Sequence, residues 1–281
     1  MELVYGTSSA RHGSQVCSAQ ILSYLLYPRS MVMGAIIRAN VRCSRATARR
    51  LLLPTDTTLW RLFEREAEAL IRGLPDGAIV LDLGGGRRCV YARAVDPPGR
   101  VKLIAIDASP EELALNHDVT DKHVADVAAG LPIADASVDL ILSRALLEHV
   151  DDVPSAIRHM ARVLKPGAVA LHFVPCRYSL FGIAARLLPF RQLVWLTHTV
   201  MPHTCDAVGF PVRYDHCYPQ ALEREFRTAK FSDVQLEITW ACPGYFVAIY
   251  PLFLLHALYE QIVRHLGVRR LAAYAVVRAV R

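Results

Sequence analysis

The stretch Ile79-Val80-Leu81-Asp82-Leu83-Gly84-Gly85-Gly86 decides the fold, because it reads as a buried strand that ends in a glycine-rich turn. Its four apolar residues before the glycines are typical of a central strand covered on both faces. The glycines let the backbone turn sharply and let a ligand approach it closely. A dinucleotide-binding loop would need a further glycine where Cys89 stands, and the Asp82 carboxylate would repel a phosphate. The turn therefore favours a ligand that carries positive charge.

Three further apolar segments follow, each with a polar residue at or after its end. The segment 101–106 leads into Asp107, a later one ends at Asp126, and the strand 138–143 leads toward His149. Asp107 is placed to accept the ribose hydroxyls of an adenosine ligand, and Asp126 to reach its adenine amine. Strands that alternate with helical stretches predict an α/β fold with a doubly wound, Rossmann-like sheet. The ligand is expected at the carboxyl ends of the first two strands.

Four ordered motifs then carry a family resemblance. The runs LDLGGG at 81–86, IAIDASPEELALN at 104–116, ADVAAGLPIADASVDLILSRALLEHVDD at 125–152 and ARVLKPGAVALHFVP at 161–175 resemble the class I S-adenosylmethionine-dependent methyltransferases, type 11-like members included. The resemblance implies S-adenosyl-L-methionine as cofactor and methyl donor. The cofactor-binding residues that we predict are Asp82, Leu83, Gly84, Gly85, Gly86, Asp107, Ala108, Asp126, Val127 and Ser143.

A shorter motif resembles a narrower group of that family. Pro243-Gly244-Tyr245-Phe246, followed by an apolar helical segment and a last strand at 271–280, is similar to methyltransferases associated with cell-envelope polysaccharide or glycolipid synthesis. This resemblance implies a hydroxyl of a lipid-linked, saccharide or other membrane-associated acceptor. A small-molecule acceptor of the natural-product or quinone type stays open, as does a non-catalytic scaffold that keeps the fold. An NAD-dependent oxidoreductase is disfavoured by Cys89 and Asp82.

His149 is the catalytic candidate, because it follows the fourth strand and should face the transferred methyl group. In-line displacement from an activated sulfonium mainly needs the acceptor atom held close and aligned. A hydroxyl acceptor would also benefit from a general base. A purely structural role for His149 stays open. No metal site is expected, since no carboxylate and histidine cluster has ligand spacing.

Charge and hydropathy divide the chain of 281 residues, which has a net charge of +6. Residues 56–152 hold 10 Lys/Arg against 18 Asp/Glu, whereas residues 153–281 hold 15 against 7. The acidic part is the cofactor part, and the basic part carries the positions expected for the acceptor. Basic residues interleaved with aliphatic runs do not resemble an RNA-binding module, so no nucleic acid partner is expected.

Two apolar segments suggest contact with a membrane. Residues 238–259 contain no Asp, Glu, Lys or Arg, and this length could span a bilayer. We argue against a span, because the flanking stretches 234–240 and 271–278 should pair as an antiparallel closing hairpin of the sheet. A helical pair interrupted at Pro251 and lying in the membrane interface is expected instead. Peripheral membrane contact is thus predicted through 244–258 and 178–196, with a lid over the site or a dimer interface as alternatives.

The domain organisation follows from these segments. Residues 1–55 carry seven Arg and one acid, and they are expected to be a disordered or mis-assigned extension, with a transit peptide or a membrane-surface arm as alternatives. Residues 56–281 form the predicted methyltransferase domain, with helical acceptor-side insertions after strands five and six, at about 177–218 and 243–268. A cytoplasmic protein, peripheral at the inner membrane face, is expected. The oligomeric state is not predicted.

Overall fold

The computed structural model describes residues 31–51, 53, 57–189, 192, 211–242 and 246–281. The chain separates into two compact units, which we describe one at a time. The larger unit comprises 54–187, 211–242 and 260–281. The smaller unit comprises 1–53, 188–210 and 243–259.

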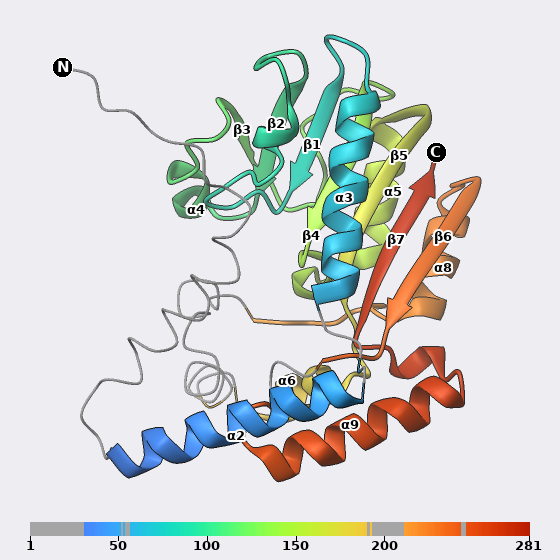
Figure 1. Ribbon diagram of the computed structural model, residues 1–281. Helices are drawn as coiled ribbons and strands as arrows, with labels where there is room; N and C mark the ends of the chain where they lie inside the picture. The colour runs from blue at the N-terminus through green and yellow to red at the C-terminus, as the bar shows by residue number, and fades with distance from the viewer. Residues whose placement is uncertain (1–30, 52, 54–56, 190–191, 193–210, 243–245) are drawn as a thin grey trace, which may run out of the picture. The chain divides into compact units, whose positions relative to one another are not determined.

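The larger unit is built on one seven-stranded sheet in the order β3-β2-β1-β4-β5-β7-β6 (Figure 1). Strands β1 to β5 are mutually parallel, and β7 runs antiparallel to both of its neighbours, β5 and β6. This confirms the predicted sheet and the pairing of the last two strands. The strands are β1 (Ile79–Leu83), β2 (Lys102–Asp107), β3 (Asp121–Val124), β4 (Val138–Arg144), β5 (Leu164–Pro175), β6 (Asp233–Thr239) and β7 (Tyr274–Val280).

Helices cover both faces of this sheet, which explains the continuous apolar run of β1. Val80 packs in one core with helix α3, and Leu81 packs in the other with α5 and α8 (Figure 1). Successive strand residues point to opposite faces, so both must be apolar. The helices of the larger unit are α3 (Thr57–Gly73), α4 (Pro110–Ala114), α5 (Val153–Val163), α6 (Leu180–Leu187) and α8 (Pro219–Thr228), with short turns η1 (Ala92–Ala94), η2 (Leu147–His149) and η5 (Arg269–Leu271).

The smaller unit contains α2 (Met31–Arg50) and the first part of α9 (Tyr250–His265). Residues 31–50 of the predicted N-terminal extension form the helix α2, while residues 1–30 lie outside the described residues. Our prediction that Pro251 interrupts a helical pair is wrong. It stands in the first turn of α9, where its missing N–H has no intrahelical partner to lose. Among the described residues, no helix combines the length and apolar character that crossing a bilayer requires.

Candidate functional site

The glycine turn after β1 has a backbone that only glycine adopts without strain. Gly84 and Gly86 have φ angles of +72° and +37°, in the left-handed region. A Cβ on Gly85 would lie 2.9 Å from the Ala105 Cβ and 3.1 Å from the Asp82 carbonyl oxygen. The three glycines thus keep the backbone close to β2 and leave room in front of it for a ligand.

Hydrogen bonds from neighbouring segments hold this turn in place. The amides of Gly84 and Gly85 both donate to the Ile106 carbonyl, at 2.7 and 3.2 Å. The Asn116 side chain, fully buried, donates to the carbonyls of Gly85 and Gly86 at 3.0 and 3.1 Å. Our site prediction omitted Asn116, although it ends the quoted motif at 104–116. An asparagine about 30 residues beyond a glycine turn does not by itself indicate that the two are in contact, because only the fold brings them together.

Asp107 lies at the tip of β2, directly beside the turn. Its carboxylate accepts the Gly86 amide at Oδ2 (3.0 Å) and the Ser109 amide at Oδ1 (2.9 Å). A carboxylate offers about four lone-pair sites, so two remain for other donors. The side chain is half-buried, and the adjacent Ala108 is exposed. Asp107 is therefore fixed in orientation and still able to accept hydrogen bonds from a diol.

Asp126 lies beyond the tip of the neighbouring strand. In the parallel register Asp107 is opposite Val124, which places Asp126 two residues past the same sheet edge. Its side chain is exposed, and Oδ1 accepts the Ala128 amide at 2.9 Å. The structure thus brings the predicted residues 84–86, Asp107 and Asp126 to one edge, at the ends of three adjacent strands.

Three of the predicted residues turn their side chains away from this edge. Leu83 and Val127 are core residues. Ser143 is fully buried, and its hydroxyl lies 2.7 Å from Nδ1 of His172. Only the backbone of these three residues is available to a ligand, so their predicted role in cofactor binding is narrowed to backbone contacts.

Asp82 is buried beneath the turn. Burial raises the pKa of its carboxyl to about 7, an effect that the Cys89 hydrogen bond and the nearby Arg144 partly oppose. At neutral pH the group is consequently only partly ionised. A cation bound nearby would favour the carboxylate. Arg88, two residues after the glycine turn, is exposed.

His149 ends the turn η2 after β4, and its ring is held by hydrogen bonding. Nδ1 lies 2.9 Å from the Pro211 carbonyl, which can only accept, so the proton of a neutral ring resides on Nδ1. Nε2 is then the nitrogen that can take a proton. Burial lowers the pKa of His149, partly offset by that carbonyl and by Asp107. The ring is thus neutral at physiological pH, in the tautomer that a general base requires.

Glu148, the residue before His149, is a buried acid. Its side chain is 3 % exposed, and its Oε2 has no hydrogen-bond partner among the described residues. Burial raises the pKa of Glu148 to about 8, so the group is mainly neutral at pH 7. Its Oε1 lies 3.8 Å from Nε2 of His149.

The segment 211–218 covers the end of β4. The amides of Arg213 and Tyr214 donate to the Glu148 carbonyl at 2.7 and 2.9 Å, and Val153 N donates to Asp215 at 3.2 Å. Tyr214 is 1 % exposed and has a φ of +55°, a strained conformation that the surrounding contacts must maintain. This segment fixes the ring of His149 through contacts some 60 residues apart in sequence.

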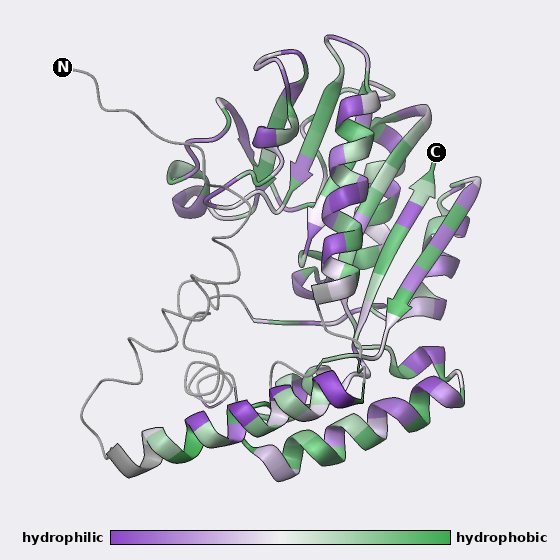
Figure 2. Cartoon of the chain, viewed as in Figure 1, coloured by the Kyte–Doolittle hydropathy of each residue, from purple (hydrophilic) through white to green (hydrophobic). Residues whose placement is uncertain are grey.

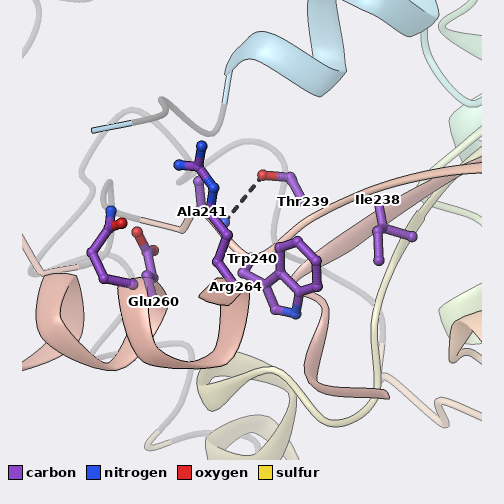
Figure 3. Close-up of a pocket in the computed structure, with 7 residues that line it drawn as sticks. Ile238, Thr239, Trp240, Ala241, Glu260 and Arg264 are labelled. Carbon is purple, nitrogen blue, oxygen red and sulfur yellow. Dashed lines mark hydrogen bonds between the residues drawn. The ribbon is translucent and has the colours of Figure 1, made fainter. Parts of the chain in front are cut away.

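A separate cavity of about 200 Å³ lies in the larger unit, at the end of β6 (Figure 3). There the Ala241 amide donates to the Thr239 hydroxyl at 3.1 Å. Four strand spacings separate β6 from β1, roughly 19 Å at about 4.8 Å each. The cavity is therefore not part of the glycine-turn site. It is lined by Ile238, Thr239, Trp240, Ala241, Glu260, Gln261 and Arg264.

Comparison with known proteins decides the family. The model of the methyltransferase domain family matches residues 56–236, well over half of the chain. The chain belongs to this family. The prediction of a class I S-adenosylmethionine-dependent methyltransferase, with that molecule as its cofactor class, is confirmed.

Individual relatives of this methyltransferase match over shorter stretches. The ubiquinone/menaquinone biosynthesis C-methyltransferase UbiE of Hahella chejuensis is 35 % identical over 118 residues, which are 39 % of this chain and 46 % of that protein. An arsenite methyltransferase of Aquipseudomonas alcaligenes is 36 % identical over 34 % of this chain and 32 % of its own. The match thus spans less than half of either relative. A solved SAM-dependent methyltransferase from Archaeoglobus fulgidus aligns with a TM-score of 0.49 and 16 % identity, over 79 % of this chain and 94 % of that chain.

Proposed function

We propose that this protein transfers a methyl group from S-adenosyl-L-methionine to a hydroxyl of a lipid-linked, saccharide or other membrane-associated acceptor. The observation that carries methyl transfer is Asp107, whose carboxylate joins the Gly86 and Ser109 amides and keeps acceptor capacity at the open sheet edge. A glycine cradle that a Cβ would fill, next to an oriented carboxylate, fits an adenosyl ligand.

The donor supplies a methyl group already activated on a cationic sulfur. In this proposal Asp107 binds its ribose, Asp126 its adenine amine, and the glycines 84–86 face its methionine part. Asp82 favours the positive charge from beneath the turn. These residues bind and orient, which is the main requirement of an in-line displacement.

On the acceptor side, His149 is proposed to take the proton of the acceptor hydroxyl at Nε2. Its neutral ring and the Nδ1 contact with the Pro211 carbonyl support this role. Glu148, neutral and buried beside it, adds no full negative charge that would hold the proton on His149. A base of lowered pKa transfers the proton onward readily after the methyl group has moved.

A membrane-associated acceptor is supported by the exposed apolar residues of the smaller unit. Leu255 and Leu258 are 66 % and 59 % exposed on α9. We propose peripheral membrane contact through 244–258 and 178–196, of which 244–245, 190–191 and 193–196 lie outside the described residues. A cytoplasmic protein that visits the inner membrane face would meet such an acceptor.

A second candidate function is methylation of a small quinone-type molecule. It is favoured by the match to the Hahella chejuensis C-methyltransferase, which is named for ubiquinone/menaquinone biosynthesis. That relative acts at carbon, whereas a neutral His149 suits an oxygen acceptor. The atom that gains the methyl group therefore separates the two candidates.

Two measurements test the proposal. Calorimetry should detect binding of S-adenosylhomocysteine in preference to NAD, and Asp107→Ala should lose at least about tenfold in affinity, since a hydrogen bond to a charged group contributes about 1.5–3 kcal/mol. Asp76→Ala, at a side chain that is 87 % exposed, is the matched control. Transfer of radiolabelled methyl from the donor to a lipid extract, a soluble extract and a quinone then identifies the acceptor class. No heat with either S-adenosylmethionine or its demethylated product would refute the proposal.

A further inference from the structure

Two segments of the smaller unit, α2 and residues 247–250, are joined along one face of α2. The Asn40 amide donates to the Ala248 carbonyl at 3.0 Å, and the Ser44 hydroxyl to the Val247 carbonyl at 3.1 Å. The Thr47 hydroxyl lies 2.9 Å from the Tyr250 hydroxyl. Residues 40, 44 and 47 follow helical spacing, so one side of α2 is committed to this seam. The side of α2 that carries Asn40, Ser44 and Thr47 thus faces inward, and its other sides face away from the seam.

The start of α9 leaves large apolar side chains exposed outside this seam. Phe253, His256 and Ala257 are buried, and the intervening positions are not. Leu252, Leu255 and Leu258 follow one another at three-residue spacing along one side of the helix. Exposed apolar residues that form a contiguous row mark an interaction site. The exposed fractions are 50 % for Ile249, 41 % for Leu252, 39 % for Leu254, 66 % for Leu255 and 59 % for Leu258.

Among the described residues of the smaller unit, every Asp, Glu, Lys or Arg is an arginine. Helix α2 carries Arg38, Arg42, Arg45, Arg49 and Arg50, and neither 31–53 nor 246–259 contains an Asp or Glu. Figure 2 shows hydrophilic positions recurring along α2 and hydrophobic positions on α9. In the larger unit, by contrast, exposed arginines such as Arg72 and Arg227 pair with glutamates four residues away. The arginines of α2 therefore present charge to an outside partner.

We propose that α2 and residues 249–258 together form a docking surface for the anionic face of a lipid bilayer. Leucines that enter the headgroup region, together with arginines that meet anionic headgroups, are what an interfacial helix requires. A second copy of the chain would bring five arginines against five more. A nucleic acid would leave the leucine row in water. The inference rests on the proposed function, because this surface would bring the enzyme to the membrane-associated acceptor proposed above.

Flotation of the full-length protein with vesicles tests this surface without donor or acceptor. Wild type should float with phosphatidylcholine vesicles that contain about one third phosphatidylglycerol and stay behind with phosphatidylcholine alone. The double variant Arg42→Gln/Arg49→Gln should bind about 30-fold more weakly, at about fivefold per arginine. Leu255→Gln should lose about tenfold. The matched controls Arg72→Gln/Arg227→Gln and Leu62→Gln, at the 40 % exposed Leu62, should stay within about twofold.

Three results would overturn the inference. They are equal binding of wild type to both kinds of vesicle, unchanged binding of the double arginine variant, and a concentration-dependent dimer that Leu255→Gln dissolves. Circular dichroism and thermal melts on the same variants show that each is folded. Calorimetry with S-adenosylhomocysteine keeps the two proposals apart, because failed donor binding refutes the proposed activity and leaves flotation unaffected.

Discussion

Replacing Asn116 with alanine tests whether the glycine turn depends on the side chain that joins its two carbonyls. The Asn116 amide donates to Gly85 and Gly86, and its oxygen accepts the Asp118 amide at 3.0 Å. The residue is fully buried, so water cannot readily replace these bonds. The Asp118 carboxylate in turn accepts the Cys89 amide at 3.0 Å, which extends the same network past the turn.

The cost of Asn116→Ala can be worked from these contacts. A net contribution of about 0.5–1.5 kcal/mol for each of three hydrogen bonds gives a loss of about 3 kcal/mol in the free energy of unfolding. In the variant, the glycine turn would lack these hydrogen bonds, so ligand binding would have to supply the free energy that orders it. About 1.4 kcal/mol of such ordering corresponds to a tenfold weaker affinity for S-adenosylhomocysteine.

Urea denaturation and calorimetry on the purified variant measure both quantities. Ser137→Ala is the control, because it removes one exposed hydrogen bond, to the Ala134 carbonyl, and should cost under about 1 kcal/mol. An ordinary surface substitution changes the free energy of unfolding by at most about 0.5 kcal/mol. If the free energy of unfolding of Asn116→Ala differs from that of wild type by no more than this, the turn is held by its own backbone and the reasoning fails.

Three further predictions concern the residues around the turn. Gly85→Ala should cost about 1–3 kcal/mol and weaken donor binding, because its Cβ meets Ala105 at 2.9 Å; Gly73→Ala, with nothing within 4 Å, should be neutral or slightly stabilising in the same thermal melts. Burial raises the pKa of Glu148 to about 8 from 4.5, so wild type loses stability as pH rises between these values, and Glu148→Gln should gain a few kcal/mol over wild type at about pH 8 but little at about pH 5. An equal advantage at both pH values in urea titrations would refute that assignment. His149→Ala should lower turnover with the true acceptor by about 10²–10⁴ while leaving S-adenosylhomocysteine affinity nearly unchanged, and full turnover would exclude it as the base.

The parallel sheet, and the strand tips that carry the proposed donor-binding residues, could be predicted because local patterns determine them. Buried runs with alternating helices fix a parallel sheet, and the tip of each strand follows from where the apolar run ends. Gly84, Asp107 and Asp126 were placed correctly at one edge for this reason. The antiparallel end of the sheet was also predictable, since 234–240 and 271–278 show strand patterns and should pair as the closing hairpin of this fold.

The features that could not be predicted from the sequence depend on contacts between segments that are far apart in the chain. Asn116 reaches back 30 residues to the glycines, and α2 meets 247–250 more than 200 residues away. Neither contact produces a periodic pattern of residues in the sequence. The interpretation of Pro251 failed for a different reason, because a proline reads as a break in any helical run unless the helix begins there.

The two sides of the proposed site differ in how strongly they constrain the sequence. This difference explains why the donor could be predicted from the sequence and the acceptor could not. The proposed donor-binding end of the sheet is constrained by its backbone: Gly84 and Gly86 have positive φ angles, and a Cβ on Gly85 would lie too close to Ala105. Such constraints admit few residues, so they mark the sequence. The proposed acceptor side depends on the segment 211–218. Its backbone amides donate to the Glu148 carbonyl, and its strained Tyr214 is a residue type with no preference for that conformation. Many sequences could supply those contacts, and the chemistry they select can therefore be read only from the folded chain and tested on its acceptor.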